Sequence, residues 1–386
     1  MNLIKTGTKV TLLAISTLTV MSNAAIITSL PHLGQHFNNI ANIELLSRLM
    51  ITLPSLAIAL LSPFLGHLIY KTSVVKSAIF GLLLFGIAGS AGLYLDDMYR
   101  LLFSRIFLGI AIAMLMIVGT SLIGDYFKGP ARHKFMGLQS ACVSLGGIMF
   151  ISGGGILSDI HWKYPFGIYL IGLCIVPLAI LFLREPQNLP HDEDEKEISG
   201  SLYSIYFLAF VMMLLFYTLP TQMPFLIMNH FGASGTMAGF IISTAMGSSA
   251  LGALSFAKLK HHLSFKTIYL IGIATLACGF IAIGSITHVS FFFISSPIMG
   301  FSNGLLMTTT MAWMLQRADA KKRIKASAYF TSSLYAGQFC SPLLFHPIVK
   351  QVGLQDFFIL LGLSIGLILL GIKASEKLRK IDKNKP

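Results

Sequence analysis

Ten stretches of this 386-residue chain contain no Asp, Glu, Lys or Arg, and they constrain the fold more than any other feature of the sequence. A helix of about 20 apolar residues can cross a bilayer, because it satisfies its backbone hydrogen bonds internally. Two of the stretches, 198–257 and 267–316, are long enough for two such helices each, and polar segments at 229–236 and 284–290 divide them. The sequence therefore predicts an all-α membrane protein with twelve transmembrane helices, within residues 10–43, 49–70, 77–95, 106–124, 135–158, 164–183, 198–257, 267–316, 326–349 and 357–372.

The distribution of basic residues predicts the orientation of these helices. If the N-terminus is cytoplasmic, 23 of the 28 Lys and Arg residues fall on the cytoplasmic side, as cytoplasmic loops require. The run that follows Lys5 and Lys9 is too long for a signal peptide and is interpreted as helix 1. We expect a multi-pass protein of the inner (cytoplasmic) membrane with both termini cytoplasmic. The net charge of +13 then reflects topology, and no nucleic-acid partner is implied.

A single long hydrophilic segment divides the chain. Residues 184–201 contain two prolines and six acidic residues, and they separate helices 6 and 7. We predict an N-terminal six-helix bundle at 1–183, a cytoplasmic linker at 184–201, a C-terminal six-helix bundle at 202–373 and a basic cytoplasmic tail at 374–386.

The two predicted bundles share landmarks at nearly constant spacing. Pro31 in helix 1 and Pro220 in helix 7 are 189 positions apart, and Gly109 and Gly300 are 191 apart. The same offset of 191 relates Arg132 to Arg323. Six helices per unit give both units the same orientation, so the sequence predicts two halves related by a pseudo-twofold axis along the membrane normal. Both prolines should bend their helices at the outer end.

Three local motifs resemble one transporter family. The segment GHLIYKTSVVK (66–76) keeps a glycine and a basic residue of the family's GxxxDRxGRR loop but has Tyr70 where that loop has Asp. Arg105, Gly109 and Ala113 match RxxxGxxxA, and residues 153–170 are similar to the GGxL…WRxPF segment of bacterial drug exporters. In these motifs and in its predicted topology, the chain resembles the major facilitator superfamily. The resemblance implies that family's fold and a monomeric secondary transporter of the drug-efflux type.

In that fold the substrate lies near the midplane between the halves. Polar and aromatic side chains of the predicted helices are therefore the candidate cavity residues, with interhelical hydrogen bonding as the alternative role. They are Asn23, Arg105, Tyr217, Gln222, Asn303, Tyr335 and Gln338. Arg105 stands out, because a guanidinium inside a helix needs a partner or must reach the headgroups. We expect it to donate to helix 1.

Residues near the inner face are candidates for a cytoplasmic gate. Asp125 is the acidic residue close to several basic loops, and we expect an ion pair that stabilises the outward-facing state. The candidate gate residues are Gly66, Lys71, Asp125, Arg132 and Arg323. No Asp or Glu falls in the middle of a predicted span, so Glu44 and His346 are the candidate proton carriers if protons drive transport. This charge pattern favours an anionic, zwitterionic or neutral substrate.

The sequence predicts no cofactor and no metal. The four cysteines have no CxxC spacing, and His32 and His36 stand four residues apart without a third ligand. No P-loop or catalytic triad is present, so an enzyme is disfavoured. The favoured function is export of a small molecule by alternating access. Uptake of a small organic anion or nutrient and a receptor or scaffold without a transport cycle remain alternatives.

Overall fold

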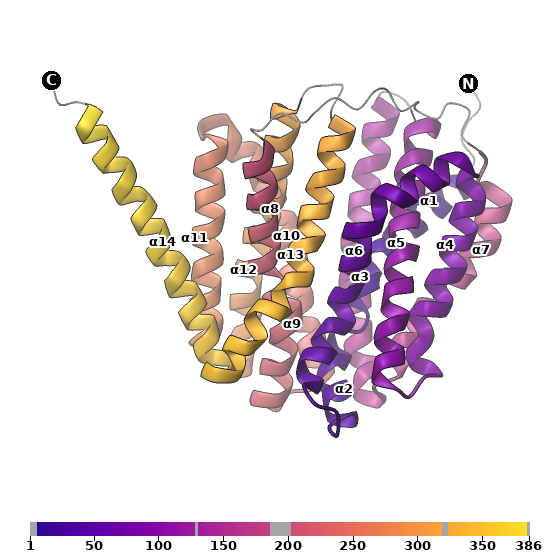
Figure 1. Ribbon diagram of the computed structural model, residues 1–386, viewed down its shortest axis with the longest axis horizontal. Helices are drawn as coiled ribbons and strands as arrows, with labels where there is room; N and C mark the ends of the chain where they lie inside the picture. The colour runs from indigo at the N-terminus through magenta and orange to yellow at the C-terminus, as the bar shows by residue number, and fades with distance from the viewer. Residues whose placement is uncertain (1–5, 128–129, 186–201, 319–322, 384–386) are drawn as a thin grey trace.

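The structure is a computed structural model that describes residues 6–127, 130–185, 202–318 and 323–383, and all its regular elements in these ranges are helices (Figure 1). The N-terminal half contains α1 (Thr6–Ala24), η1 (Ile27–Ser29), α2 (Leu30–His36), α3 (Ile43–Lys71), α4 (Val74–Gly89), η2 (Ser90–Leu93), α5 (Met98–Tyr126), α6 (Pro130–Ile160), η3 (Tyr164–Leu170) and α7 (Ile171–Phe182). The C-terminal half contains α8 (Tyr203–Phe216), α9 (Thr218–Phe225), η5 (Leu226–His230), α10 (Gly235–His262), α11 (Phe265–Gly284), η6 (Val289–Phe291), α12 (Phe292–Arg317), α13 (Arg323–Val352) and α14 (Leu354–Lys383).

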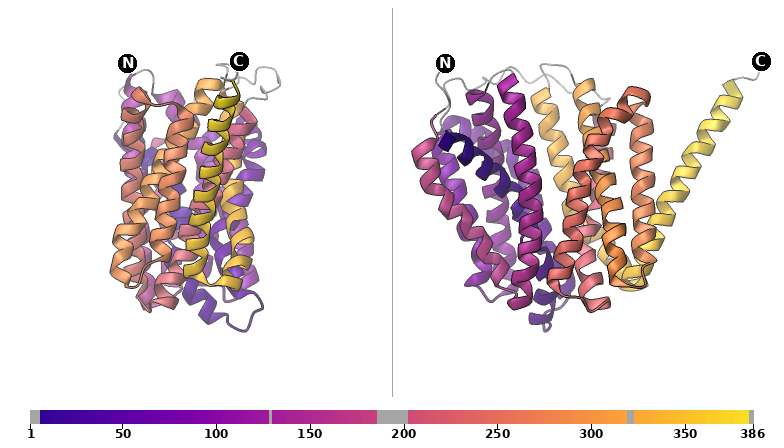
Figure 2. Two further views of the ribbon diagram at one scale, coloured as in Figure 1. Left: turned by 90° about the vertical axis from the view of Figure 1, so that its left-hand side faces the viewer. Right: turned by 180° about the vertical axis from the view of Figure 1, so that it is seen from behind.

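These helices form the predicted twelve spans once α1 is joined with α2 and α8 with α9. In the described residues, ten spans have the length and hydropathy of a membrane helix. The other two spans are α1 and α13. Both ends of the chain lie at the same end of the bundle, which we call the termini end, and the opposite end is the far end (Figure 1). The C-terminal part of α14 leans away from the other helices (Figure 2).

The predicted duplication is visible in how the helices pack. In the N-terminal half α5 packs against α3 and α4, and in the C-terminal half α12 packs against α10 and α11. A Cβ added to Gly109 would lie 2.5 Å from the carbonyl oxygen of Pro54, and one added to Gly300 would lie 2.0 Å from that of Ala245. Pro54 and Ala245 are 191 positions apart, like the two glycines. The same pair of close helix contacts therefore occurs once in each half.

The helix ends carry the same repeat. Ser73 caps the first turn of α4 by accepting a hydrogen bond from the backbone N–H of Lys76. Ser264, again 191 positions later, caps α11 by accepting from the N–H of Thr267. Such caps satisfy backbone donors that a helix leaves without partners at its start. The repeat thus sets where the helices begin as well as how they pack.

Helices 1 and 7 are both interrupted near their prolines. Helix 1 stops at Ala24 and resumes as α2, in which Pro31 is the second residue. Helix 7 breaks at Tyr217 and resumes as α9, in which Pro220 is the third residue. Proline is tolerated in the first turn of a helix because its missing N–H would have no intrahelical partner there. The expected disruption is confirmed, and each proline lies just after the break.

Candidate functional site

The two halves meet along two helix pairs, α3 with α13 and α6 with α10. α6 and α10 approach closely at the far end, where a Cβ on Gly155 would lie 2.5 Å from the carbonyl oxygen of Gly235. Beside this contact the hydroxyls of Ser152 and Ser243 are 2.9 Å apart. Small residues allow this approach, since they let two backbones come into contact.

Several of the expected cavity residues form hydrogen bonds between the halves. Asn23, near the end of α1, donates from Nδ2 to the hydroxyl of Tyr217 at 2.6 Å. Ser55 of α3 donates to Oε1 of Gln338 in α13 at 2.9 Å. The hydroxyl of Tyr335 lies 3.4 Å from Sδ of Met116 in α5. The helices α1, α3, α5 and α13, together with the break between α8 and α9, therefore contribute these groups to the interface between the halves.

Arg48 is the main residue of this interface that the sequence analysis did not select. Its side chain is 1% exposed, and Nε donates to Oε1 of Gln222 in the other half at 2.9 Å. Its guanidinium lies over the ring of Phe225, with Cζ 4.0 Å from the ring centroid. In the sequence it directly precedes the predicted span at 49–70. The burial results from α9, which brings Gln222 and Phe225 over the beginning of α3.

The negative partner of Arg48 is exposed. Glu44 lies one turn earlier in α3 and accepts from Nη1 of Arg48 at 3.4 Å, while its own side chain is 62% exposed. Nη1 of Arg48 also donates to the backbone carbonyl of Glu44 at 2.9 Å. A turn containing Asn42, which has φ 57°, leads into α3 and places this pair at the far end. Asn adopts left-handed backbone conformations more readily than most residues.

Two buried polar atoms beside Arg48 have no hydrogen-bond partner among the described residues. One is Nε2 of Gln222, whose side chain is fully buried, and the other is Nδ1 of His346, which is 7% exposed. The imidazole of His346 is close enough to interact electrostatically with Arg48 and Glu44. Buried polar groups are normally hydrogen-bonded, so two such atoms next to one cation require an explanation.

A carboxylate fastens the two halves together at the far end. Asp159, at the end of α6, accepts hydrogen bonds from the backbone N–H groups of Gly235 and Thr236 at 2.5 and 2.8 Å. It also accepts from the hydroxyl of Thr236 at 2.5 Å. Gly235 and Thr236 are the first two residues of α10, so Asp159 places a negative charge at the positive end of that helix. We call this contact the Asp159 latch.

Arg105 lies inside the N-terminal half, as expected, but its expected partner was wrong. It is fully buried and donates from Nη2 to the carbonyl oxygens of Ala88 and Gly89 at 2.8 and 2.9 Å. These are the last residues of α4, so the guanidinium caps the end of α4, the third span, and does not bind α1, the first span. The rings of Phe166 and Tyr169 flank it, 5.3 and 5.6 Å from Cζ. Carbonyls at a helix C-terminus attract a cation, and this explains how the charge is held.

The remaining expected residues are less informative. Asn303 of α12 is partly buried, and its Oδ1 has no partner among the described residues. A Cβ on Gly66 would meet nothing within 4 Å, so Gly66 marks no close contact in this conformation. The side chains of Lys71, Arg132 and Arg323 lie outside the described parts of the structure, as does most of the predicted linker. The predicted pairing of Asp125 therefore stays a prediction.

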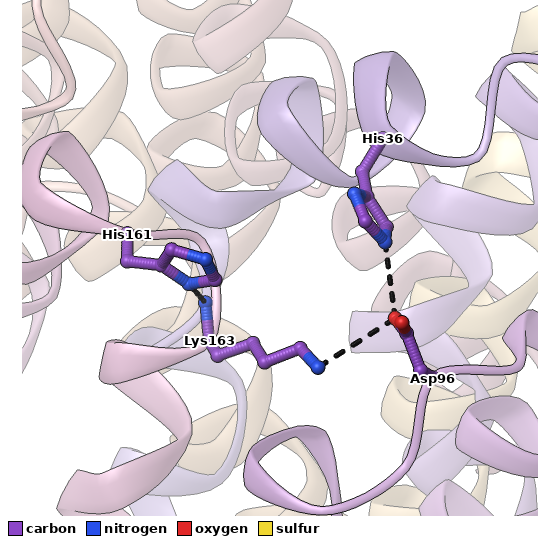
Figure 3. Close-up of polar contacts among 4 residues, drawn as sticks. All are labelled: His36, Asp96, His161 and Lys163. Atoms are coloured by element: carbon purple, nitrogen blue, oxygen red, sulfur yellow. Dashed lines mark hydrogen bonds and ion pairs between the residues drawn. The ribbon is translucent and has the colours of Figure 1, made fainter.

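A separate polar cluster joins the end of α2 to two loops of the N-terminal half at the far end (Figure 3). Oδ1 of Asp96 lies 3.0 Å from Nε2 of His36 and 3.6 Å from Nζ of Lys163. The hydrogen bond from His36 lowers the pKa of Asp96 below the usual carboxyl range, with a smaller contribution from the charge of Lys163. The backbone N–H of Lys163 donates to Nδ1 of His161 at 3.2 Å. The contacts in this cluster are all within the N-terminal half, so we assign it to holding the loops in place.

Comparisons with known proteins agree with this architecture. The model of the Major Facilitator Superfamily matches residues 12–221 and 205–385. Multidrug resistance protein 1 of Bacillus subtilis (strain 168) is 29% identical over 161 residues, which cover 40% of this chain and 41% of that protein. Multidrug efflux pump SdrM of Staphylococcus aureus (strain N315) is 27% identical over 187 residues, covering 48% of this chain and 40% of that protein. The matched regions thus span about two fifths of the length of these relatives.

A solved structure extends the likeness to nearly the whole chain. A bacterial homolog of the human lysosomal transporter Spinster, in an inward-facing and unoccupied conformation, superposes with a TM-score of 0.72 at 17% identity. The superposition covers 92% of this chain and 87% of that chain. At this level of identity the likeness concerns the fold, with its twelve helices in two halves.

Proposed function

The chain belongs to the major facilitator superfamily, and on that premise we propose that this membrane transporter exports a small organic molecule by alternating access. In this proposal the termini end is cytoplasmic and the far end faces outward across the inner membrane. The excess of Lys and Arg in the loops of the termini end supports this orientation. The partial similarity to proteins named as multidrug exporters supports the direction of transport.

The observation that carries the proposal is the polar seal at the far end. Hydrogen bonds from Asn23 to Tyr217, from Arg48 to Gln222 and from the start of α10 to Asp159 each join one half to the other. Alternating access requires contacts of this kind, because one end must close while the other opens. Individually these bonds are modest, so the seal can break during a transport cycle.

We propose that Asn23, Tyr217, Gln222, Tyr335 and Gln338 contact the substrate when this interface opens. Their polar groups come from both halves, which is the arrangement a site between two rocking units requires. Arg105 is removed from this set, because it is fully buried within one half and bound to α4. Glu44 and His346 remain the proposed proton carriers.

The proposal can be tested in inside-out membrane vesicles from cells that express the chain. With an imposed pH gradient, acidic inside, we expect the zwitterionic dye rhodamine B to accumulate in the vesicles, and accumulation should stop when the gradient is collapsed. The variant Gln338→Leu should reduce the rate, because it removes a polar group from the interface between the halves. Gln355→Leu is the matched control, since Gln355 binds the carbonyl of Ile286 within the C-terminal half.

The other functions give different results in the same assay. Accumulation only in right-side-out vesicles would indicate uptake. No movement of rhodamine B or of other small organic probes in either orientation, with normal protein levels, would favour a receptor or scaffold. Accumulation that persists without any gradient would contradict proton coupling.

A further inference from the structure

We propose that Arg48, Gln222 and His346 form a binding subsite for an organic carboxylate at the far end of the transport pathway, with Glu44 as an internal competitor. This inference rests on the proposed function and names the chemical class of a substrate or of a counter-substrate. It gives Arg48 a role in binding in addition to its place at the start of a predicted span.

Arg48 carries a buried positive charge. A guanidinium remains protonated in proteins, and a buried cation without adequate compensation destabilises a structure by several kcal/mol. Here the side chain is 1% exposed, and its negative partner Glu44 is 62% exposed at a distance of 3.4 Å. The compensation is therefore incomplete, because water screens an exposed carboxylate.

The buried nitrogens Nε2 of Gln222 and Nδ1 of His346 have no hydrogen-bond partner among the described residues. An amide nitrogen such as Nε2 of Gln222 is always a donor, and Nδ1 of His346 is a donor in one tautomer. Leaving such a group buried and unpaired destabilises the protein by about 1–3 kcal/mol. A ligand with two acceptor oxygens offers acceptors to these nitrogens as well as to the guanidinium. A carboxylate has this geometry, and Arg binds it through two parallel hydrogen bonds.

The surroundings of Arg48 indicate what the rest of the ligand is like. The face of the Arg48 guanidinium is covered by Phe225, which is 3% exposed. A carboxylate that reaches this position enters an apolar and aromatic surrounding. An organic carboxylate with an apolar body fits this surrounding better than a small hydrated inorganic anion does, because apolar surface is removed from water.

A ligand can reach Arg48 when the far end opens. Arg48 and Gln222 belong to different halves, so opening the far end separates them and exposes the guanidinium to the outer solution. Glu44 is in the same helix as Arg48 and moves with it. In the open state Glu44 and the ligand then compete for the guanidinium, and closure of the far end returns Gln222 and His346 to the bound carboxylate. Removing the charge of Glu44 should therefore strengthen ligand binding.

The test uses the purified full-length chain in detergent, with benzoate as the probe and benzamide as its uncharged analogue. We expect benzoate to raise the unfolding temperature above that in an equal concentration of chloride, and benzamide to have no effect. Glu44→Gln should tighten benzoate binding by about threefold or more, and Arg48→Gln should weaken it by about tenfold or more, as loss of a charged hydrogen bond implies. Arg100→Gln is the matched control, because it removes an exposed cation from the same end.

Each outcome decides the proposal. Tighter binding in Glu44→Gln supports it even if Arg48→Gln does not fold. An equal response to benzoate and benzamide, an equal loss in Arg100→Gln, or unchanged binding in Glu44→Gln would overturn it. Rhodamine B export by a protein that does not respond to benzoate would leave the exporter proposal standing without the subsite. Benzoate binding by a protein that transports neither rhodamine B nor benzoate would support the subsite and contradict the exporter proposal.

Discussion

The Asp159 latch gives a prediction whose size can be worked out from the structure. In Asp159→Asn the side chain keeps one carbonyl oxygen but loses its charge and its second acceptor. Hydrogen bonds to a charged group contribute about 1.5–3 kcal/mol, neutral ones about 0.5–1.5, and a charge at a helix terminus about 0.3–1. Because Asp159 is exposed, we take the low end and expect the closed far end to lose about 1–2 kcal/mol.

That loss should shift the population toward the state that is open at the far end by about 5- to 30-fold. The assay is the labelling rate of Ser243→Cys by a charged thiol reagent added from the far end, in a chain whose four native cysteines are replaced. Ser243 is 6% exposed and bonded to Ser152 across the interface, so it reacts only when the halves separate. Labelling should accelerate in Asp159→Asn.

Asp97→Asn provides the matched control for this experiment. Asp97 also caps a helix at the far end, by accepting from the backbone N–H of Arg100, but its contact lies within the N-terminal half. It should leave the labelling rate of Ser243→Cys unchanged. An unchanged rate in Asp159→Asn, or an equal acceleration in Asp97→Asn, would refute the assignment of Asp159 as a contact that closes the far end.

Three further predictions concern other parts of the fold. Asp125→Asn should shift the population in the opposite direction, toward the state open at the termini end, by about 1–3 kcal/mol; unchanged thiol accessibility at both ends would contradict it. Arg105→Lys should lower the unfolding temperature and impair transport, because one ammonium cannot reproduce the planar guanidinium, whose Nη2 reaches Ala88 and Gly89 while Nε reaches Ser104; normal stability and activity would contradict both. Gly109→Ala should destabilise the protein by about 1–3 kcal/mol, since its Cβ would lie 2.5 Å from a backbone oxygen of α3. Gly119→Ala is its control in the same helix, because nothing lies within 4 Å there.

The twelve spans and the internal repeat could be predicted from the sequence, because both depend on local patterns. Hydropathy sets the position of each span, and a duplicated unit leaves landmarks at a constant spacing. The pair Gly109 and Gly300 even identifies the packing contact that recurs in each half. Contacts inside a half follow from these patterns more directly than contacts between halves.

The candidate site could be predicted only in part, because it depends on which segments of the two halves meet. The spacing of Glu44 and Arg48 is visible in the sequence, but their burial under Gln222 and Phe225 depends on α9. Gly109 and Ala113 follow Arg105 at four-residue spacing, which is typical of a helix face that contacts a close neighbour, and for Gly109 that neighbour is α3. The guanidinium points instead to the end of α4, and the spacing of residues along α5 contains no information about that choice.

The interruptions in helices 1 and 7 have a mechanical consequence. Each break separates a short segment at the far end, α2 or α9, from the helix that precedes it, and these two segments lie against each other. Short segments behind a hinge can swing while the rest of each half stays packed. The moving part at the far end then consists of α2 and α9, which are smaller than a six-helix half. We expect these two segments to open and close more often than the whole transporter completes its cycle.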